Sequence, residues 1–480
     1  MRWLKLLLPL SLLATACAPA VLPGLRTEVP LPRISLTGAS LSVSLSGKIT
    51  TQALPAAWDS ARIVVSSYNL KQPLDSGILL ASATPLTHTF NVPPGMVSVR
   101  VDLLHSGHVV ASGSSEAQVG PGANSVTIEL STVLSTIVTF AGNGMDAFAD
   151  GMGTEARFNA PRGLALDDQG NLYVADYGNS SIRKVAPDGQ VSTIAGADQF
   201  QGPTGLAFDA ASRKLYVSDR LRHEIRVLHL DQNPGDQGFV TTLAGAGQEG
   251  DVDGLGSEAT FSSPEGLALF GDFLFVADTG NHKVRQIDRF NGGVATYAGH
   301  AGPGYQDGFI QTARFMAPRG VTMAPSGRLY VADTGNHAIR EIGGGLVSTV
   351  AGGPTSGKAI GTGGPGGTTR FHDPAAVIWG GRGTWAGSLF ILDQRNYRIC
   401  RLDLGLLEDD ADYVTEFMGG GGSGMGEGPP GGASFVWPYG MVVEPIPPQS
   451  QSQATYFYVA DTDNHRIVRG VFAGVGPQVP

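Results

Sequence analysis

The feature that most constrains this chain is a unit that recurs along it. Residues 315–352 read FMAPRGVTMAPSGRLYVADTGNHAIREIGGGLVSTVAG. Two short strand patterns, GVTMA and RLYVAD, flank a Pro-Ser-Gly turn, and a polar corner, TGNH, leads into two further strand patterns. Four short strands in about forty residues is the size of one propeller blade. One such sheet cannot bury both of its faces alone, so the unit predicts copies of itself.

The copies are present along the C-terminal two thirds of the chain. Each begins at a proline just before an apolar run: Pro161, Pro203, Pro264, Pro318, Pro374 and Pro438. The second strand pattern recurs as LYVAD, LYVSD, LFVAD, LFILD and FYVAD. Six aligned copies predict a β-propeller.

An asymmetry at the two ends of this array sets the number of blades. The sixth copy ends after its third strand pattern, HRIVRGVF, and an unpartnered strand pattern, STIVTFAG, precedes the first copy and ends at Gly142. We predict that this early strand completes the last blade and closes a six-bladed ring, because closure removes the two free sheet edges.

The corner motif carries a resemblance to a known family. It reads NHAIR, NHKVR and NHRIV in three copies, and the pattern resembles the NHL repeat, over about residues 136–474. The resemblance implies a β-propeller. Some similar propellers are amidating lyases or gluconolactonase-like hydrolases, which hold a metal with side chains from several inner strands.

The N-terminus has the parts of an export signal. Arg2 and Lys5 precede an apolar stretch, and small residues follow it directly before Cys17. The segment looks like a bacterial lipoprotein signal with Cys17 lipidated, although Ala14 stands where leucine is usual. The expected location is therefore the cell envelope, with the protein anchored to the membrane by its lipid. The alternative is cleavage near Ala16 and a soluble secreted protein.

The chain divides into five predicted parts. Residues 1–17 are the signal peptide, 18–32 a proline-containing tether, and 33–131 a small Ig-like or prealbumin-like β-sandwich built from seven alternating strand patterns. Residues 132–474 form the propeller, and 475–480 are a tail. The fold class is therefore all-β, a sandwich followed by an NHL-type propeller.

The repeated aspartates and histidines of the corners are interpreted as structural. They are Asp176, Asp278, His282, Asp333, His337, Asp461 and His465. One Asp-His pair per blade, spread around a ring, cannot converge on one substrate, whereas a hydrogen bond repeated in each blade stabilises its corner. Cys400 is interpreted as a structural thiol.

A candidate binding face follows from the lengths of the connections. The connections before five of the inner strands, those that start at Pro161, Pro264, Pro318, Pro374 and Pro438, are long and glycine-rich. They share a face with the corners, as binding loops on repeat proteins often do. The candidate residues on this face are Arg157, Arg162, Glu265, Arg314, Arg319, Arg370 and Tyr439. The alternative is that the arginines cap loop carbonyls or pair with nearby acids.

The sequence offers little for a metal or a catalytic residue. The predicted innermost strands contain no histidine, and carboxylates appear there only as Asp167, Asp209 and Glu444. The Asp-Gly loops hint at calcium through Asp146, Asp150, Asp251, Asp253 and Asp307, but they lack the spacing of an EF-hand. We expect no cofactor, with calcium or zinc in the propeller as the alternative and its ligands unknown.

These patterns together predict a binding scaffold. We expect a monomer that recognises a protein or a cell-envelope glycan through the long-loop face. The net charge of −10 argues against nucleic acid as a partner. The competing prediction is a metal-dependent lyase or lactonase-like hydrolase with its site in the propeller channel.

Overall fold

A computed structural model describes residues 137–473, apart from 301, 362–366, 381–386, 405–412, 420–421, 428–432 and 445–453. Of residues 1–136 it gives the backbones of short strands only. The longest of these are β6 (Ser60–Ser67), β9 (Gly95–His105) and β10 (His108–Val119), which pair antiparallel in that order. The sandwich predicted for residues 33–131 and the lipidation predicted at Cys17 lie outside the described residues.

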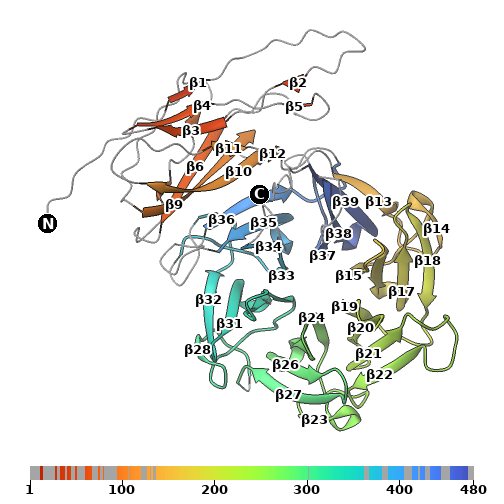
Figure 1. The fold of residues 1–480 in the computed structure, drawn as a ribbon. Helices are drawn as coiled ribbons and strands as arrows, with labels where there is room; N and C mark the ends of the chain where they lie inside the picture. Colours follow the sequence, from red (N-terminus) through yellow and green to blue (C-terminus); the bar gives the residue numbers. More distant parts are fainter. Residues whose placement is uncertain are drawn as a thin grey trace.

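Six antiparallel sheets stand radially around a central axis (Figure 1). Blade 1 comprises β15 (Pro161–Leu166), β16 (Leu172–Asp176), β17 (Ser181–Val185) and β18 (Gln190–Ala195). Blade 2 comprises β19 (Pro203–Asp209), β20 (Lys214–Asp219), β21 (Glu224–His229) and β22 (Val240–Ala244). Blade 3 comprises β24 (Pro264–Phe270), β25 (Phe273–Asp278), β26 (Lys283–Asp288) and β27 (Gly293–Ala298).

The second half of the ring repeats this pattern. Blade 4 comprises β29 (Val321–Met323), β30 (Leu329–Asp333), β31 (Ala338–Gly343) and β32 (Leu346–Gly352). Blade 5 comprises β33 (Pro374–Trp379), β34 (Ser388–Asp393), β35 (Arg398–Asp403) and β36 (Tyr413–Gly419). Blade 6 comprises β37 (Pro438–Val443), β38 (Ala454–Asp461), β39 (Arg466–Ala473) and β13 (Ile137–Gly142). Blades 1, 3 and 4 each gain a two-residue outer strand, namely β14 (Gly151–Met152), β23 (Gly254–Leu255) and β28 (Gly308–Phe309).

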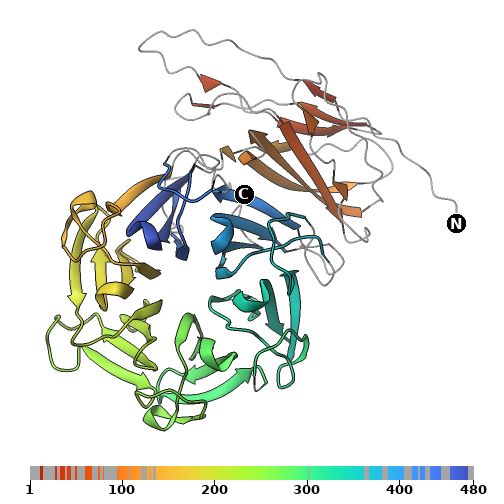
Figure 2. The same ribbon diagram turned by 180° about the vertical axis from the view of Figure 1, so that it is seen from behind.

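The ring is closed by the strand that precedes the first copy of the repeat. β13 pairs antiparallel with β39, with Ile137 opposite Gly470 and Gly142 opposite Arg466. Both views show orange β13 beside dark blue β39 (Figures 1 and 2). The prediction of a six-bladed propeller closed by this strand is confirmed.

The apolar core lies between the blades. One cluster of buried side chains joins Val174 and Val185 of blade 1 to Ala460 and Ile467 of blade 6, and corresponding clusters lie between the other neighbouring blades. Each blade therefore buries its faces only when its neighbours are present, which is the physical reason for the repeat.

Glycines bring the innermost strands close together around the axis. The amide of Gly266 donates to the carbonyl oxygen of Arg319 in the next blade at 2.9 Å. A Cβ at Gly266 would lie 2.2 Å from that same oxygen, and one at Gly205 would lie 2.1 Å from the carbonyl oxygen of Glu265. The residues just before these glycines are consequently held near the axis.

The described part of the chain contains no helix with the length and apolar character needed to cross a bilayer. Its helices are single 3-10 turns. Five of them form the corners between second and third strands: η2 (Tyr177–Asn179), η4 (Thr279–Asn281), η5 (Thr334–Asn336), η7 (Gln394–Asn396) and η9 (Thr462–Asn464).

Candidate functional site

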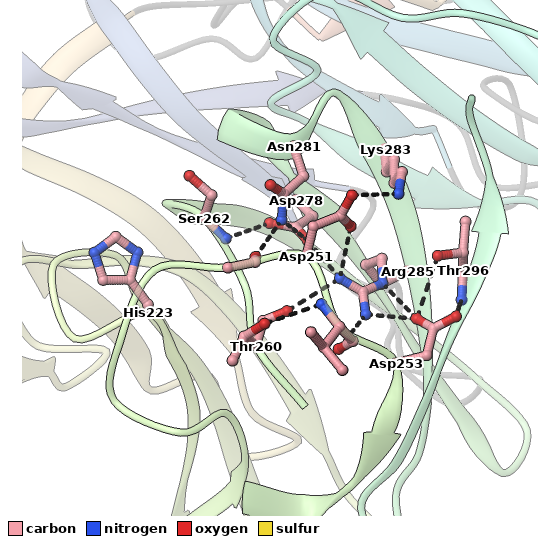
Figure 3. A network of polar contacts seen from close by, with 12 residues as sticks. His223, Asp251, Asp253, Thr260, Ser262, Asp278, Asn281, Lys283, Arg285 and Thr296 are labelled. Carbon is pink, nitrogen blue, oxygen red and sulfur yellow. Dashed lines mark hydrogen bonds and ion pairs between the residues drawn. The ribbon is translucent and has the colours of Figure 1, made fainter. Parts of the chain in front are cut away.

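Every blade has a buried aspartate where its second strand ends, and this residue organises the corner. In blade 3 (Figure 3), Asp278 accepts hydrogen bonds from the Ser262 amide, from Asn281 Nδ2 and from Arg285 Nη1, each at 2.8 Å. Arg285 is fully buried, and its Nη2 reaches Asp253 Oδ1 at 2.5 Å. The corner therefore ties the long loop before the blade to the blade itself.

In blades 5 and 6 the arginine that binds the corner aspartate comes from a different position of the third strand. Blades 1, 3 and 4 place the arginine seven residues after the corner aspartate, whereas Cys400 and Val468 occupy that position in blades 5 and 6. There the arginine comes two residues earlier, and Arg398 Nε donates to Asp393 at 2.7 Å while Arg466 Nε donates to Asp461 at 2.8 Å. Residues two apart on a strand share a face, so either position can reach the aspartate.

The corner histidines connect neighbouring blades. Nδ1 of His282 accepts the amide of Ala317 at 2.9 Å, and Nδ1 of His465 accepts the amide of Ala160 at 3.1 Å. His337 does the same for Asp373, at 3.2 Å. Burial lowers the pKa of His282 and of His337, which favours the neutral ring that such an acceptor requires. Each histidine serves a different blade junction, and the structure does not bring them together.

Four of the five Asp-Gly loop carboxylates are bound by cations of the same blade. Asp150, Asp253 and Asp307 each accept from a buried arginine and from a threonine of the fourth strand. Asp251 pairs with Lys283 at 2.6 Å. The described residues include no group of three or more His, Cys, Asp or Glu side chains placed to hold a metal ion.

The strand-end carboxylates at the opposite face also have partners. Asp167 accepts from Asn171 Nδ2 at 2.8 Å and from the Tyr173 hydroxyl at 3.1 Å. Asp209 binds Ser212 and Arg289. Burial raises the pKa of the Glu444 carboxyl, opposed by a hydrogen bond with the Tyr456 backbone and by the charge of Arg469.

The candidate residues of the long-loop face fall into two sets. Arg157, Arg314 and Arg370 lie within the loops, where their carbonyl oxygens accept from the buried arginines of their blades. The Arg157 side chain donates to the carbonyl oxygens of Thr154 and Glu155, both at 2.8 Å. The Arg370 side chain likewise donates to loop carbonyl oxygens, at 2.7 Å. Arg157 and Arg370 thus cap their own loops.

The other set meets near the axis. Arg162, Glu265, Arg319 and Tyr439 all occupy the position just after the first proline of a repeat, which in blades 2 and 5 holds Thr204 and Ala375. The Tyr439 hydroxyl donates to Glu265 Oε2, although blades 6 and 3 face each other across the ring. Arg319 Nε lies 3.5 Å from the same carboxylate oxygen.

A second repeat position contributes residues that the sequence analysis missed. The residue after the corner aspartate is threonine in blades 3, 4 and 6, where Thr279, Thr334 and Thr462 each donate to a proline carbonyl of the next blade at 2.7 Å. In blades 1, 2 and 5 it is Tyr177, Arg220 and Gln394. The absence of threonine at this position in three blades was the sequence signal that could have identified these residues as part of the site.

These departures from the repeat extend the site. Arg220 Nε lies 2.9 Å from Glu265 Oε1, and Gln394 Oε1 accepts from Arg319 Nη1 at 3.3 Å. The Arg162 guanidinium stacks on the Tyr177 ring, 3.4 Å from its centroid. We refer to the group that these contacts join as the axial cluster: Arg162, Tyr177, Arg220, Glu265, Arg319, Gln394 and Tyr439.

The axial cluster carries excess positive charge. It contains three guanidinium groups and one carboxylate, and the Glu265 side chain is only 3% exposed. Burial and the Glu265 carboxylate raise the pKa of Tyr439, so its phenol stays protonated at neutral pH and donates to Glu265. Burial opposes the charge of Arg220, but the adjacent Glu265 raises its pKa on balance. Such an arrangement favours a bound anion.

Comparison with known proteins identifies the repeat. Residues 135–302 match the family model of the Teneurin NHL domain, and residues 315–342 match that of the NHL repeat. Over these residues the repeat is of the NHL type. The resemblance inferred from the corner motifs is therefore confirmed there, while the lipoprotein character of the chain stays a prediction.

Relatives of the NHL propeller are much longer proteins. The chain is 29% identical over 315 residues to the protein SUPPRESSOR OF QUENCHING 1, chloroplastic, of Arabidopsis thaliana, covering 59% of this chain and 28% of that protein. It is 32% identical over 180 residues to human NHL repeat-containing protein 2, covering 32% of this chain and 24% of that protein. The chain thus spans about a quarter of the length of each.

A solved structure shares the fold. It is described as an auxiliary nutrient binding protein from Bacteroides thetaiotaomicron and superposes with a TM-score of 0.53 at 15% identity, covering 93% of this chain and 96% of that one. At this identity the likeness concerns the fold alone.

Proposed function

We propose that this NHL propeller is a binding scaffold, and that its axial cluster on the long-loop face recognises an anionic group of a protein or a cell-envelope glycan. One observation carries the proposal. The residue after the first proline of the repeat is threonine or alanine in two blades, and the residue after the corner aspartate is threonine in three. In the remaining blades these two positions hold arginine, tyrosine, glutamate or glutamine, and those side chains meet near the axis.

The cluster is better suited to binding than to catalysis. Its one carboxylate, Glu265, accepts from Arg220 and from the Tyr439 hydroxyl, faces Arg319 and is only 3% exposed, so it is poorly placed to take a proton from a substrate. The competing function, a metal-dependent lyase or lactonase, needs ligands that converge on one point. The described residues supply no such group.

The setting of this function is also part of the proposal. An export signal ending at Cys17 would hold the propeller at the cell envelope by a lipid, with the long-loop face available to partners. The description of a protein of the same fold as an auxiliary nutrient binding protein agrees with a binding role in such a setting.

The proposal is tested by capture on the immobilised full-length protein. Labelled glycan and protein fractions of the cell envelope are passed over the wild-type protein and over a double variant, Arg162→Ala with Arg319→Ala. We expect at least about tenfold weaker retention by the double variant, because charge-assisted hydrogen bonds to an anion are lost.

Arg328→Ala is the matched control for this experiment. Arg328 lies in the turn after a first strand, on the opposite face, and its side chain is 58% exposed. Retention should be unchanged in this variant. Equal retention by the wild type and the double variant would rule out the axial cluster as the binding site. Deleting residues from the loop 246–260 would test the binding face less cleanly than the double variant, because Asp253 in that loop forms an ion pair with the buried Arg285.

A further inference from the structure

We infer that the axial cluster takes a carboxylated sugar, a uronic acid, and that Arg162 is the guanidinium that receives the carboxylate. This inference rests on the proposed function and names the ligand class for the same site. It follows from the contacts that Arg162 makes, from the way the cluster already holds one carboxylate, and from the aromatic rings around it.

Arg162 is the cation of the cluster that has no carboxylate at ion-pair distance, although Asp463 of the blade 6 corner is near enough to interact with it electrostatically. Arg220 and Arg319 both lie against Glu265, at 2.9 and 3.5 Å. Among the described residues, no carboxylate forms an ion pair with Arg162, and its Nε is buried without a hydrogen-bond partner. A guanidinium that is taken partly out of water gains from an incoming anion the interactions that the protein does not provide.

Two tyrosine rings hold Arg162 in place before any ligand arrives. Its guanidinium carbon lies 3.4 Å from the centroid of the Tyr177 ring and 4.8 Å from that of Tyr439. Stacking on both rings restricts the rotamers of a long side chain, so little conformational entropy is lost when a ligand binds. Arg162 is thus preorganised for a planar anionic group.

Glu265 shows what the cluster does with a carboxylate. One of its oxygens faces Arg220, and the other faces Arg319 and accepts from the Tyr439 hydroxyl. The carboxylate is thus held by guanidinium and phenol donors. Arg162, beside the same tyrosine, offers guanidinium donors to a second carboxylate, and the excess positive charge of the cluster accommodates it.

The aromatic rings favour a sugar as the carrier of that carboxylate. Tyr177 and Tyr439 flank Arg162. Trp437 stands two residues before Tyr439 in the chain, and its ring centroid lies 5.2 Å from the Arg395 guanidinium carbon. The C–H face of a pyranose packs well on aromatic rings, which combine a large apolar surface with few rotatable bonds. A uronic acid presents such a face together with a carboxylate, whereas an acidic peptide side chain offers only the carboxylate.

Titration calorimetry on the full-length protein tests the inference with defined probes. The probes are tri-galacturonate, its methyl ester, glucuronate and tri-glutamate, at low ionic strength. We expect the two uronates to bind, the neutral ester to give no measurable heat, and tri-glutamate to bind at least tenfold more weakly. Arg162→Ala should weaken uronate binding at least tenfold, and Arg162→Lys should weaken it too, because lysine lacks the planar fork. Arg328→Ala should have no effect.

The outcomes separate this inference from the proposed function. If tri-glutamate binds more tightly than the uronates and still depends on Arg162, the site stands and the sugar assignment is overturned. If neither the uronates nor tri-glutamate bind, or if the uronates bind equally well to the wild type and to Arg162→Ala, the ligand class is wrong. The capture of envelope fractions then decides independently whether the axial cluster binds any ligand. Because the methyl ester comparison uses the unaltered protein, poor folding of a variant cannot mask the result.

Discussion

The corner aspartate is bound in the same way in five of the six blades, and Asp219 in blade 2 is the exception. In the other blades an asparagine and an arginine both bind the corner aspartate. In blade 2 the asparagine position holds Arg222, whose Nε lies 3.4 Å from Asp219, and Arg226 binds Glu224 instead. Burial therefore raises the pKa of Asp219 to about 7, opposed chiefly by the Gln201 amide.

This pKa predicts a stabilising substitution with a defined pH dependence. The unfolded aspartate loses its proton near pH 4, about its ordinary pKa, whereas the folded one keeps it until about pH 7. The contribution of Asp219 to the stability therefore falls as the pH rises between these values and changes no further above them. We expect Asp219→Asn to match the wild type near pH 4 and to exceed it at pH 8 by on the order of 2–4 kcal/mol, since each pKa unit corresponds to about 1.4 kcal/mol.

Chemical denaturation across pH 4–8 measures this difference in free energy of unfolding. Asp188→Asn, at an exposed turn aspartate that accepts the Gln190 amide, is the control and should show no such trend. A constant difference between Asp219→Asn and the wild type over the whole range would contradict the assigned ionisation.

At the scale of the blade, the sequence predicted the elements well and the site only in part. The strand patterns and corners were predictable because each copy repeats the same turn residues and apolar alternation. Arg162, Glu265, Arg319 and Tyr439 were found because they follow the repeated prolines. The sequence did not predict that these four side chains meet, because contacts across the ring depend on how close the inner strands lie to one another.

Two other features of the blades escaped the sequence for local reasons. The guanidiniums of Arg398 and Arg466 were missed because alignment by position points to Cys400 and Val468, and only strand geometry shows that residues two apart share a face. Tyr177 and Arg220 were missed because nothing in the sequence shows that threonine at this position binds the next blade.

The inner glycines give a prediction for the blade. Gly266→Ala would place a Cβ 2.2 Å from the carbonyl oxygen of Arg319, and backbone atoms on two blades would have to move. We expect a loss of roughly 1–3 kcal/mol in the free energy of unfolding, as in overpacked cores. Gly353→Ala is the control, because a Cβ there meets only the Tyr305 hydroxyl at 3.9 Å. Denaturation of both variants by urea makes the comparison, and equal stability would mean that the inner strands are less tightly packed than they appear in the structure.

At the scale of the whole molecule, stability depends on the junction between β13 and β39. The Thr139 amide donates to Glu427 Oε1 at 2.8 Å, and Arg466 Nη1 donates to the Thr139 hydroxyl at 2.9 Å. Blade 1 has the same arrangement within a continuous segment, where the Thr193 amide donates to Asp150. The difference is that β13 also joins blade 6 to blade 1.

This difference predicts how two matched proline substitutions will behave. Val138 precedes Thr139, as Ser192 precedes Thr193, and proline at either site removes one donor from a fourth strand. Hydrogen exchange should show lost amide protection in blades 6 and 1 for Val138→Pro, and in blade 1 only for Ser192→Pro. Loss confined to β13 in Val138→Pro would mean that the ring does not depend on this closure.

The closure has a consequence for how the protein is made. Thr139 leaves the ribosome 327 residues before Arg466, its partner across the junction. At synthesis rates of about 5–20 residues per second, β13 waits roughly 15–65 s for β39 to emerge. Throughout that interval its edge has no partner from the same chain. An unpaired strand edge can pair with other chains, so this strand is exposed to aggregation until β39 emerges and the ring closes.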